Sequence, residues 1–305
     1  MFKNILFATS ATPACDHAAR VAFEMALQNA AHINILHILG VPTRGYSQEV
    51  LDIRTGEKVT LDDDYKEWVA EEIKTYYSNQ LEKAEDFDIT IGVGVPHREV
   101  LREAKKTNPD LIIVGGTTED GADSVYKKGM IGSTVHRVAK AAKCPVLAVN
   151  RPAASFWGGI SNIVFGTDFS KASDATFRFV TQLVNTLKCE LHIFHALDIS
   201  GINKGEILTQ DKIETKIRDC YRLIRGRYIA KLGEFKDYSY DVWEGIPYIE
   251  IVKYSREKQA DLIVMAGHKT KTDADDSRLG SNIEQVIARA GCPVLSVNQQ
   301  QRSDA

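Results

Sequence analysis

The side chains best suited to chemistry in this sequence are its cysteines and a close pair of histidines. The five cysteines form no CxxC, which argues against zinc and fits unpaired thiols in a reducing compartment: Cys15, Cys144, Cys189, Cys220 and Cys292. His192 and His195 stand three residues apart in a predicted strand, so their side chains should point to opposite faces. The motifs GxSxG, GxxxxGK and HExxH are absent. The sequence therefore predicts no catalytic residue and no metal site.

An internal repeat organises the chain. Residues 131–150 read IGSTVHRVAKAAKCPVLAVN and residues 279–298 read LGSNIEQVIARAGCPVLSVN, and ten of these twenty positions are identical. Near the start of each half, NILFAT at residues 4–9 matches NIVFGT at residues 162–167. A repeat of about 150 residues has the size of a domain and is too long for a solenoid unit. We predict two domains, residues 1–151 and 160–300, joined by RPAASFWGG, whose Pro, Gly and Ser are typical of a linker.

Each half alternates short apolar runs with amphipathic stretches. The runs predict strands that are covered on both faces, at residues 5–8, 33–39, 89–93, 111–114 and 146–149, and again at 163–165, 191–197, 238–243, 262–265 and 294–297. The stretches between them have helical spacing, as in residues 18–30. Alternating strands and helices predict a parallel sheet with right-handed crossovers. We therefore expect an α/β fold of two tandem, doubly wound, parallel five-stranded sheets.

Composition and charge exclude several classes of protein. Apolar residues make up 44% and charged residues 26% of the chain, which is typical of a globular protein and not of a disordered or collagen-like one. Up to Ser155 there are 18 basic and 21 acidic residues, and after it 20 of each, so neither half favours nucleic acid. No apolar stretch approaches the roughly 20 residues of a membrane helix. The apolar run at the start of the sequence is too short, and polar residues follow it too early, for a signal peptide. We predict a cytoplasmic protein with no nucleic acid or membrane partner.

Ligands of doubly wound sheets bind beyond the carboxyl ends of the strands, where the strand order reverses. The blocks that supply these positions in the second half are NIVFGTDFS, HALD, ADLIVMAGH and LGSNIEQVIARAGCPVLSVN. They resemble the universal stress protein family, and the first half repeats the same pattern. The resemblance occurs once in each half, and the two copies together cover nearly the whole chain. It implies a tandem universal stress protein with a Rossmann-like, adenine nucleotide alpha hydrolase-like fold.

The resemblance also implies where a nucleotide binds in the second half. Family members that bind ATP have an acid just after the first strand. After the fourth strand they have Gly, two residues, Gly, nine residues, then Gly-Ser or Gly-Thr. Asp168 stands at the acid position, and Gly267 and Gly280 are thirteen residues apart, as the outer glycines of the motif are. Glycines let the backbone approach phosphates, and a helix opening at Gly280-Ser281 attracts anions through the N–H groups of Ser281 and Asn282.

Both halves depart from this motif. In the second half Thr270 replaces the middle glycine. The nearby carboxylates of Asp273, Asp275 and Asp276 would repel a triphosphate unless a cation lies between them, and solvated loop charges with no ligand are the alternative. In the first half Ser10 replaces the acid, and the outer glycines are seventeen residues apart. We expect the site of the first half to be degenerate.

The leading interpretation is a stress-response regulator that binds ATP or ADP, with or without magnesium, in its second half. His195 and Ala196, at the end of the second strand, border the nucleotide in the family mainly through backbone, and packing is the alternative for His195. A non-nucleotide interaction protein and a slow metal-dependent ATPase are the alternative functions. The last apolar run of each half would leave a bare sheet edge, so we expect the halves to pair within one chain. A homodimer and an unidentified protein partner stay open.

Overall fold

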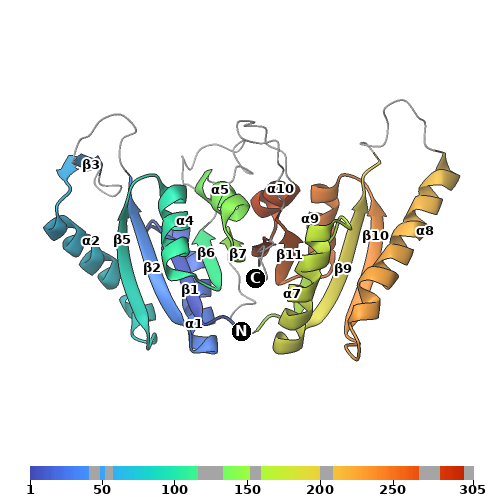
Figure 1. The fold of residues 1–305 in the computed structure, drawn as a ribbon, viewed down its shortest axis with the longest axis horizontal. Helices are drawn as coiled ribbons and strands as arrows, with labels where there is room; N and C mark the ends of the chain where they lie inside the picture. The colour runs from blue at the N-terminus through green and yellow to red at the C-terminus, as the bar shows by residue number, and fades with distance from the viewer. Residues whose placement is uncertain are drawn as a thin grey trace, which may run out of the picture. The chain divides into compact units, whose positions relative to one another are not determined.

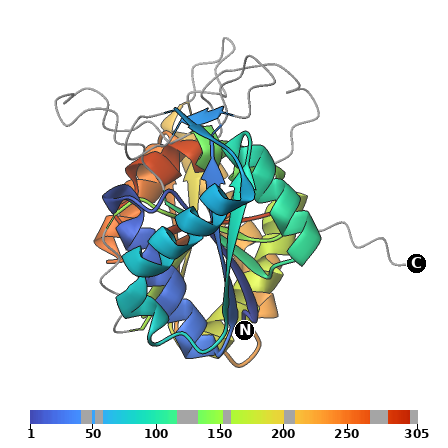
Figure 2. The same ribbon diagram turned by 90° about the vertical axis from the view of Figure 1, so that its left-hand side faces the viewer.

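Two compact units make up the described part of the chain. The computed structural model describes residues 1–40, 49–51, 58–115, 133–151, 159–199, 209–267 and 282–298. Among these residues, one unit runs up to Asn150 and the other begins at Arg151. Each unit is a parallel sheet with helices on both faces, as Figure 1 shows for both units and Figure 2 shows for the first unit after a turn of 90°.

The first unit has five parallel strands. Their spatial order is β7 (Val146–Val149), β6 (Leu111–Gly115), β1 (Asn4–Thr9), β2 (His32–Leu39) and β5 (Phe87–Val93). Its helices are η1 (Pro13–Cys15), α1 (Asp16–Asn29), α2 (Asp63–Tyr76), α3 (Ser78–Leu81), α4 (Pro96–Thr107) and α5 (Ser133–Ala141). A short antiparallel hairpin, β3 (Glu49–Leu51) with β4 (Lys58–Thr60), was not predicted, because three residues are too few for a strand pattern to stand out.

The second unit repeats this arrangement. Its strands lie in the order β10 (Tyr238–Glu244), β9 (Glu190–Leu197), β8 (Asn162–Gly166), β11 (Leu262–Ala266) and β12 (Val294–Val297), again all parallel. Its helices are α7 (Lys171–Leu187), α8 (Gln210–Arg227), η2 (Ile229–Lys231), α9 (Pro247–Glu257) and α10 (Asn282–Arg289).

The strand order confirms the doubly wound fold that the sequence predicts. In each unit the chain runs outward from the first strand on one side and then crosses to the other side for its last two strands. The reversal therefore lies between β1 and β6 in the first unit and between β8 and β11 in the second. The ends of these strands are where a ligand of such a sheet binds.

Local sequence signals explain where several elements begin. Asp62 caps α2, since its Oδ1 accepts a hydrogen bond from the Tyr65 N–H at 2.8 Å, as the run of three aspartates predicts. Pro96 and Pro247 occupy the first turns of α4 and α9, where a missing N–H costs nothing. Asp261 fixes the start of β8, because its Oδ2 accepts from two successive backbone N–H groups at 2.7 and 2.9 Å.

A pair of buried hydroxyl groups lies at the carboxyl end of the first strand of each unit. Thr9 Oγ1 lies 2.6 Å from Tyr77 Oη in the first unit, and Thr167 Oγ1 lies 2.7 Å from Tyr228 Oη in the second. All four residues are at most 7% exposed. Burial raises the pKa of both tyrosines, so both phenols stay protonated. The pair ties the helix end that carries the tyrosine to the strand end that carries the threonine.

We expect Tyr77→Phe and Tyr228→Phe each to lower the free energy of unfolding by about 0.5–1.5 kcal/mol, because each removes one hydrogen bond of a buried threonine hydroxyl, which keeps its bond from a backbone N–H. Urea denaturation of the full chain measures the change. Tyr238→Phe is a suitable control, since Tyr238 is only half-buried and its hydroxyl makes no hydrogen bond with the described part of the chain. A loss as large in the control would show that the hydroxyl pairs contribute nothing of their own.

No helix in the described ranges combines the length and the apolar character that crossing a bilayer requires.

Candidate functional site

The carboxyl ends of three neighbouring strands meet at one edge of the second unit. β8 lies between β9 and β11 and is paired in register with both. Asp168 follows β8 by two residues, Ala196 lies near the end of β9, and Gly267 directly follows β11. Adjacent strands are about 4.8 Å apart, so these three positions lie side by side at the strand-order reversal.

The structure describes five of the seven predicted site residues, and Asp168 and Gly267 are two of them. His195 and Ala196 lie at the end of β9, where His195 is half-buried and Ala196 is buried. Asn282 is exposed and is the first described residue of α10. Gly280 and Ser281 lie outside the described residues.

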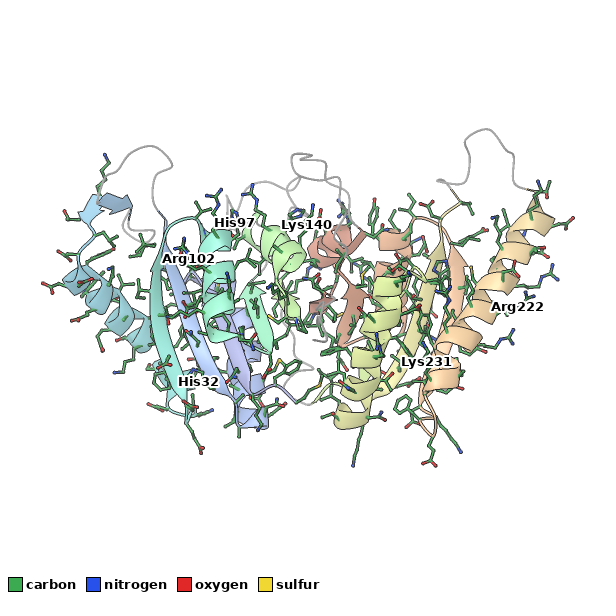
Figure 3. The ribbon with its side chains drawn as sticks, in the orientation of Figure 1. His32, His97, Arg102, Lys140, Arg222 and Lys231 are labelled. Atoms are coloured by element: carbon green, nitrogen blue, oxygen red, sulfur yellow. The ribbon has the colours of Figure 1, made fainter. Side chains whose placement is uncertain are left out.

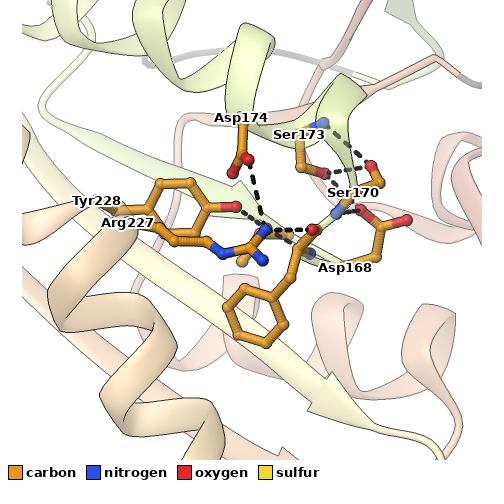
Figure 4. A network of polar contacts seen from close by, with 8 residues as sticks. Asp168, Ser170, Ser173, Asp174, Arg227 and Tyr228 are labelled. Carbon is orange, nitrogen blue, oxygen red and sulfur yellow. Dashed lines mark hydrogen bonds and ion pairs between the residues drawn. The ribbon is translucent and has the colours of Figure 1, made fainter.

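A tight polar turn presents the Asp168 carboxylate (Figure 4). Asp168 is exposed, and its Oδ1 accepts hydrogen bonds from the Ser170 backbone N–H at 3.0 Å and from Ser173 Oγ at 2.6 Å. Phe169, between Asp168 and Ser170 in the sequence, has the left-handed conformation with a φ of 60°. Its N–H donates a hydrogen bond to Thr167 Oγ1 at 3.1 Å. Ser170 Oγ in turn accepts from the Ser173 N–H and caps α7. The turn thus fixes one oxygen of a carboxylate that faces solvent.

His195 lines the same edge as a neutral imidazole. Its Nδ1 donates a hydrogen bond to the Thr167 carbonyl at 2.8 Å, and the Phe169 ring lies 4.4 Å from its ring, centre to centre. Burial lowers the pKa of His195, against the opposing effects of the Thr167 carbonyl and the Asp168 charge. With Nδ1 carrying the proton, Nε2 is the acceptor nitrogen near neutral pH.

Gly267 has no room for a side chain. A Cβ built on it would lie 1.9 Å from Asn298 Oδ1 and 3.0 Å from Ser296 Oγ. Both residues are buried, and among the described residues Ser296 Oγ has no hydrogen-bond partner. A side chain at this position would therefore displace the amide of Asn298, in addition to any effect on the approach of a phosphate that the motif implies.

The corresponding turn of the first unit keeps the backbone and loses the acid. Ala11 has the left-handed φ of 52°, and its N–H donates to Thr9 Oγ1 at 2.9 Å. Ser10 stands in place of the aspartate, with its Oγ 3.2 Å from Cys15 Sγ. The turn of the first unit therefore offers neutral groups where the second unit offers a carboxylate.

Three residues at this edge of the second unit were not predicted: Phe169, Arg227 and Asn298. Arg227 Nη1 donates to the Phe169 carbonyl at 2.6 Å across 58 positions of sequence, and no local pattern links residues so far apart. Asn298 did carry a signal, because Asn150 ends the first copy of the repeat in the same way. The repeat marked the position without indicating that it packs on Gly267.

Both halves of this chain match one family model. The model of the universal stress protein family matches residues 1–150 and again residues 159–298. Universal stress protein MJ0577 of Methanocaldococcus jannaschii is 28% identical over 157 residues, which cover 45% of this chain and 94% of that protein. Universal stress protein YxiE of Bacillus subtilis is 27% identical over 157 residues, which cover 49% of this chain and 99% of that protein. Each of these relatives thus corresponds to about half of this chain.

A solved structure matches the chain over its whole length. A universal stress protein from Archaeoglobus fulgidus covers 98% of this chain and 97% of its own, with a TM-score of 0.68 and 18% sequence identity. At that identity the match bears on the fold alone. A universal stress protein solved in complex with cAMP covers 46% of this chain and 97% of its own, with 24% identity and a TM-score of 0.35.

Proposed function

This chain belongs to the universal stress protein family, and on that premise we propose that it is a cytoplasmic stress-response regulator whose second half binds ATP or ADP. The observation that carries the proposal is the Asp168 turn, which holds an exposed carboxylate at the strand-order reversal beside Gly267. In the first half the same turn has Ser10, so we propose that the first half does not bind ATP.

Each predicted residue has a chemical task in this proposal. The Asp168 carboxylate accepts hydrogen bonds from the hydroxyls of the sugar, because ionised acceptors make the stronger bonds. The backbone around His195 and Ala196 borders the adenine ring. The phosphates lie at Gly280 and meet the backbone N–H groups of Ser281 and Asn282, which the helix start predicted from the sequence leaves unpaired.

A divalent cation completes the proposal. Asp273, Asp275 and Asp276 belong to the segment between Gly267 and Gly280 and lie outside the described residues. Three carboxylates close to a triphosphate repel it, and magnesium or manganese offsets that charge. The nucleotide therefore binds together with the metal.

Calorimetry on the full chain tests the proposal. We expect ATP binding that requires magnesium and that weakens about tenfold or more in Gly280→Val, because a bulky side chain keeps the phosphates away from the helix N-terminus. Neutralising Asp273, Asp275 and Asp276 to asparagine should weaken the metal dependence. Gly291→Val is the matched control, since a Cβ at Gly291 meets nothing within 4 Å.

One result would contradict this placement of the phosphates. Tight ATP binding without metal that survives Gly280→Val would show that the phosphates lie elsewhere.

The second candidate function, a non-nucleotide interaction protein, is favoured by Thr270 at the position of the middle glycine. It would gain support if protein purified from cells released no nucleotide on acid extraction and the wild type bound none in the calorimeter.

A further inference from the structure

Two adjacent residues at the end of α8 hold the turn that carries Asp168. Tyr228 Oη is hydrogen-bonded to Thr167 Oγ1, just before the aspartate, at 2.7 Å. Arg227 Nη1 donates to the carbonyl of Phe169, just after it, at 2.6 Å. Figure 4 shows both residues extending from the end of α8 toward the turn. The backbone of the aspartate is thus fixed at both ends by side chains of one helix end.

The Arg227 contact is the stronger kind of hydrogen bond and acts on the least favourable residue of the turn. A guanidinium donor carries a full charge, which roughly doubles the strength of a neutral hydrogen bond. Phe169 has φ 60°, a conformation that costs a non-glycine residue of order 1–3 kcal/mol and persists only where its surroundings impose it. Asp174 Oδ2 lies 3.4 Å from the same Nη1 and keeps the guanidinium in place.

The first unit supplies an internal comparison. Tyr77 corresponds to Tyr228 and keeps the bond to the threonine, at 2.6 Å. The residue before it is Tyr76, whose hydroxyl donates to Asp16 Oδ1 at 2.9 Å. A phenol has one proton to donate, so Tyr76 cannot also hold the carbonyl of the left-handed residue. The helix-end contact to that carbonyl therefore occurs in the unit that has the acid.

We propose that Arg227 is the positioning residue of the nucleotide site: by holding the Phe169 carbonyl it fixes the turn in the conformation that presents Asp168 to the ligand. This inference rests on the proposed function of the second half. Arg227 itself does not touch the nucleotide. Its effect passes through the backbone of Phe169 to the carboxylate one residue away.

Three variants of the full chain test the proposal by calorimetry with magnesium and ATP. Arg227→Met removes the donor, and we expect a loss of ATP affinity of about tenfold. Arg227→Lys keeps a charged donor on a side chain of similar length, and we expect its affinity to return to within about threefold of the wild type. Arg225→Met removes the same charge from an exposed position of the same helix and should change nothing.

Amide hydrogen exchange, followed residue by residue by NMR without ligand, separates positioning from stability. In Arg227→Met the amides of Phe169 and Ser170 should exchange at least tenfold faster, since their acceptors Thr167 Oγ1 and Asp168 Oδ1 belong to the released turn. The amides of β9 and β12 should keep their wild-type rates. Faster exchange throughout the unit would show a merely structural role and overturn the proposal.

The two proposals can fail separately. If Arg227→Met binds ATP within twofold of the wild type, or its Phe169 and Ser170 amides keep their rates, Arg227 does not position the site. If the wild type binds no nucleotide, the proposed function fails, and with it the claim that Arg227 serves a nucleotide. The amide rates then still decide whether Arg227 holds the turn.

Discussion

Replacing Asp168 with alanine is expected to weaken ATP binding about ten- to hundredfold. A hydrogen bond to a charged group contributes about 1.5–3 kcal/mol, and each 1.4 kcal/mol is a factor of ten in affinity. The variant loses the only carboxylate of the turn and also releases the Ser170 N–H and the Ser173 hydroxyl that this carboxylate fixes. Titration calorimetry of the full chain, well below the unfolding temperature, measures the change.

Two matched variants serve as controls for Asp168→Ala. Asp168→Asn keeps an oxygen that can accept from Ser170 and Ser173, so it isolates the charge from the shape of the turn. We expect it to lose nearly as much affinity as the alanine variant. Ser10→Ala changes the equivalent position of the first unit and should leave binding unaltered. Equal losses from Asp168→Ala and Ser10→Ala would contradict the assignment of the site to the second half.

Gly267→Ala is expected to destabilise the second unit by about 1–3 kcal/mol, the usual cost of forcing extra atoms into a packed core. The added Cβ would lie 1.9 Å from Asn298 Oδ1, and Asn298 is only 6% exposed, so its side chain has little room to move away. Displacing it should also distort the start of the segment that leads to Gly280, and ATP affinity should fall with stability. Urea denaturation and calorimetry on the same preparations measure both.

A double-mutant cycle identifies the cause of that loss. If the clash with Asn298 is responsible, adding Asn298→Ala to Gly267→Ala should recover most of the lost stability. Gly291→Ala is the control, because a Cβ there meets nothing within 4 Å. No recovery in the double variant would mean that the backbone of Gly267, and not its missing Cβ, is what the unit requires.

The sequence by itself determined the fold to a large extent. Its apolar runs coincide with the ten strands of the two sheets. Eight of these strands are buried almost throughout, as expected for strands covered on both faces, but β5 and β10 are half-buried, so the prediction of full burial was wrong for these two. The repeat revealed the duplication, and the starts of α2, α4 and α9 follow local residues, the Asp62 cap and the prolines at 96 and 247. These signals are local: each depends on residues within one turn or one strand.

The sequence also suggested candidate residues for the site, but not what holds them. Its resemblance to the family pointed to Asp168 and Gly267, which follow predicted strands. It could not show that Arg227 holds the carbonyl next to Asp168, that Tyr228 anchors the threonine before it, or that Asn298 fills the space beside Gly267. These contacts join residues 31 to 61 positions apart along the chain, and the rotamer and distance of each depend on how a helix end packs against a strand end. Only the tertiary structure decides them, because hydrogen-bond geometry is set by three-dimensional position and leaves no periodic trace in the sequence.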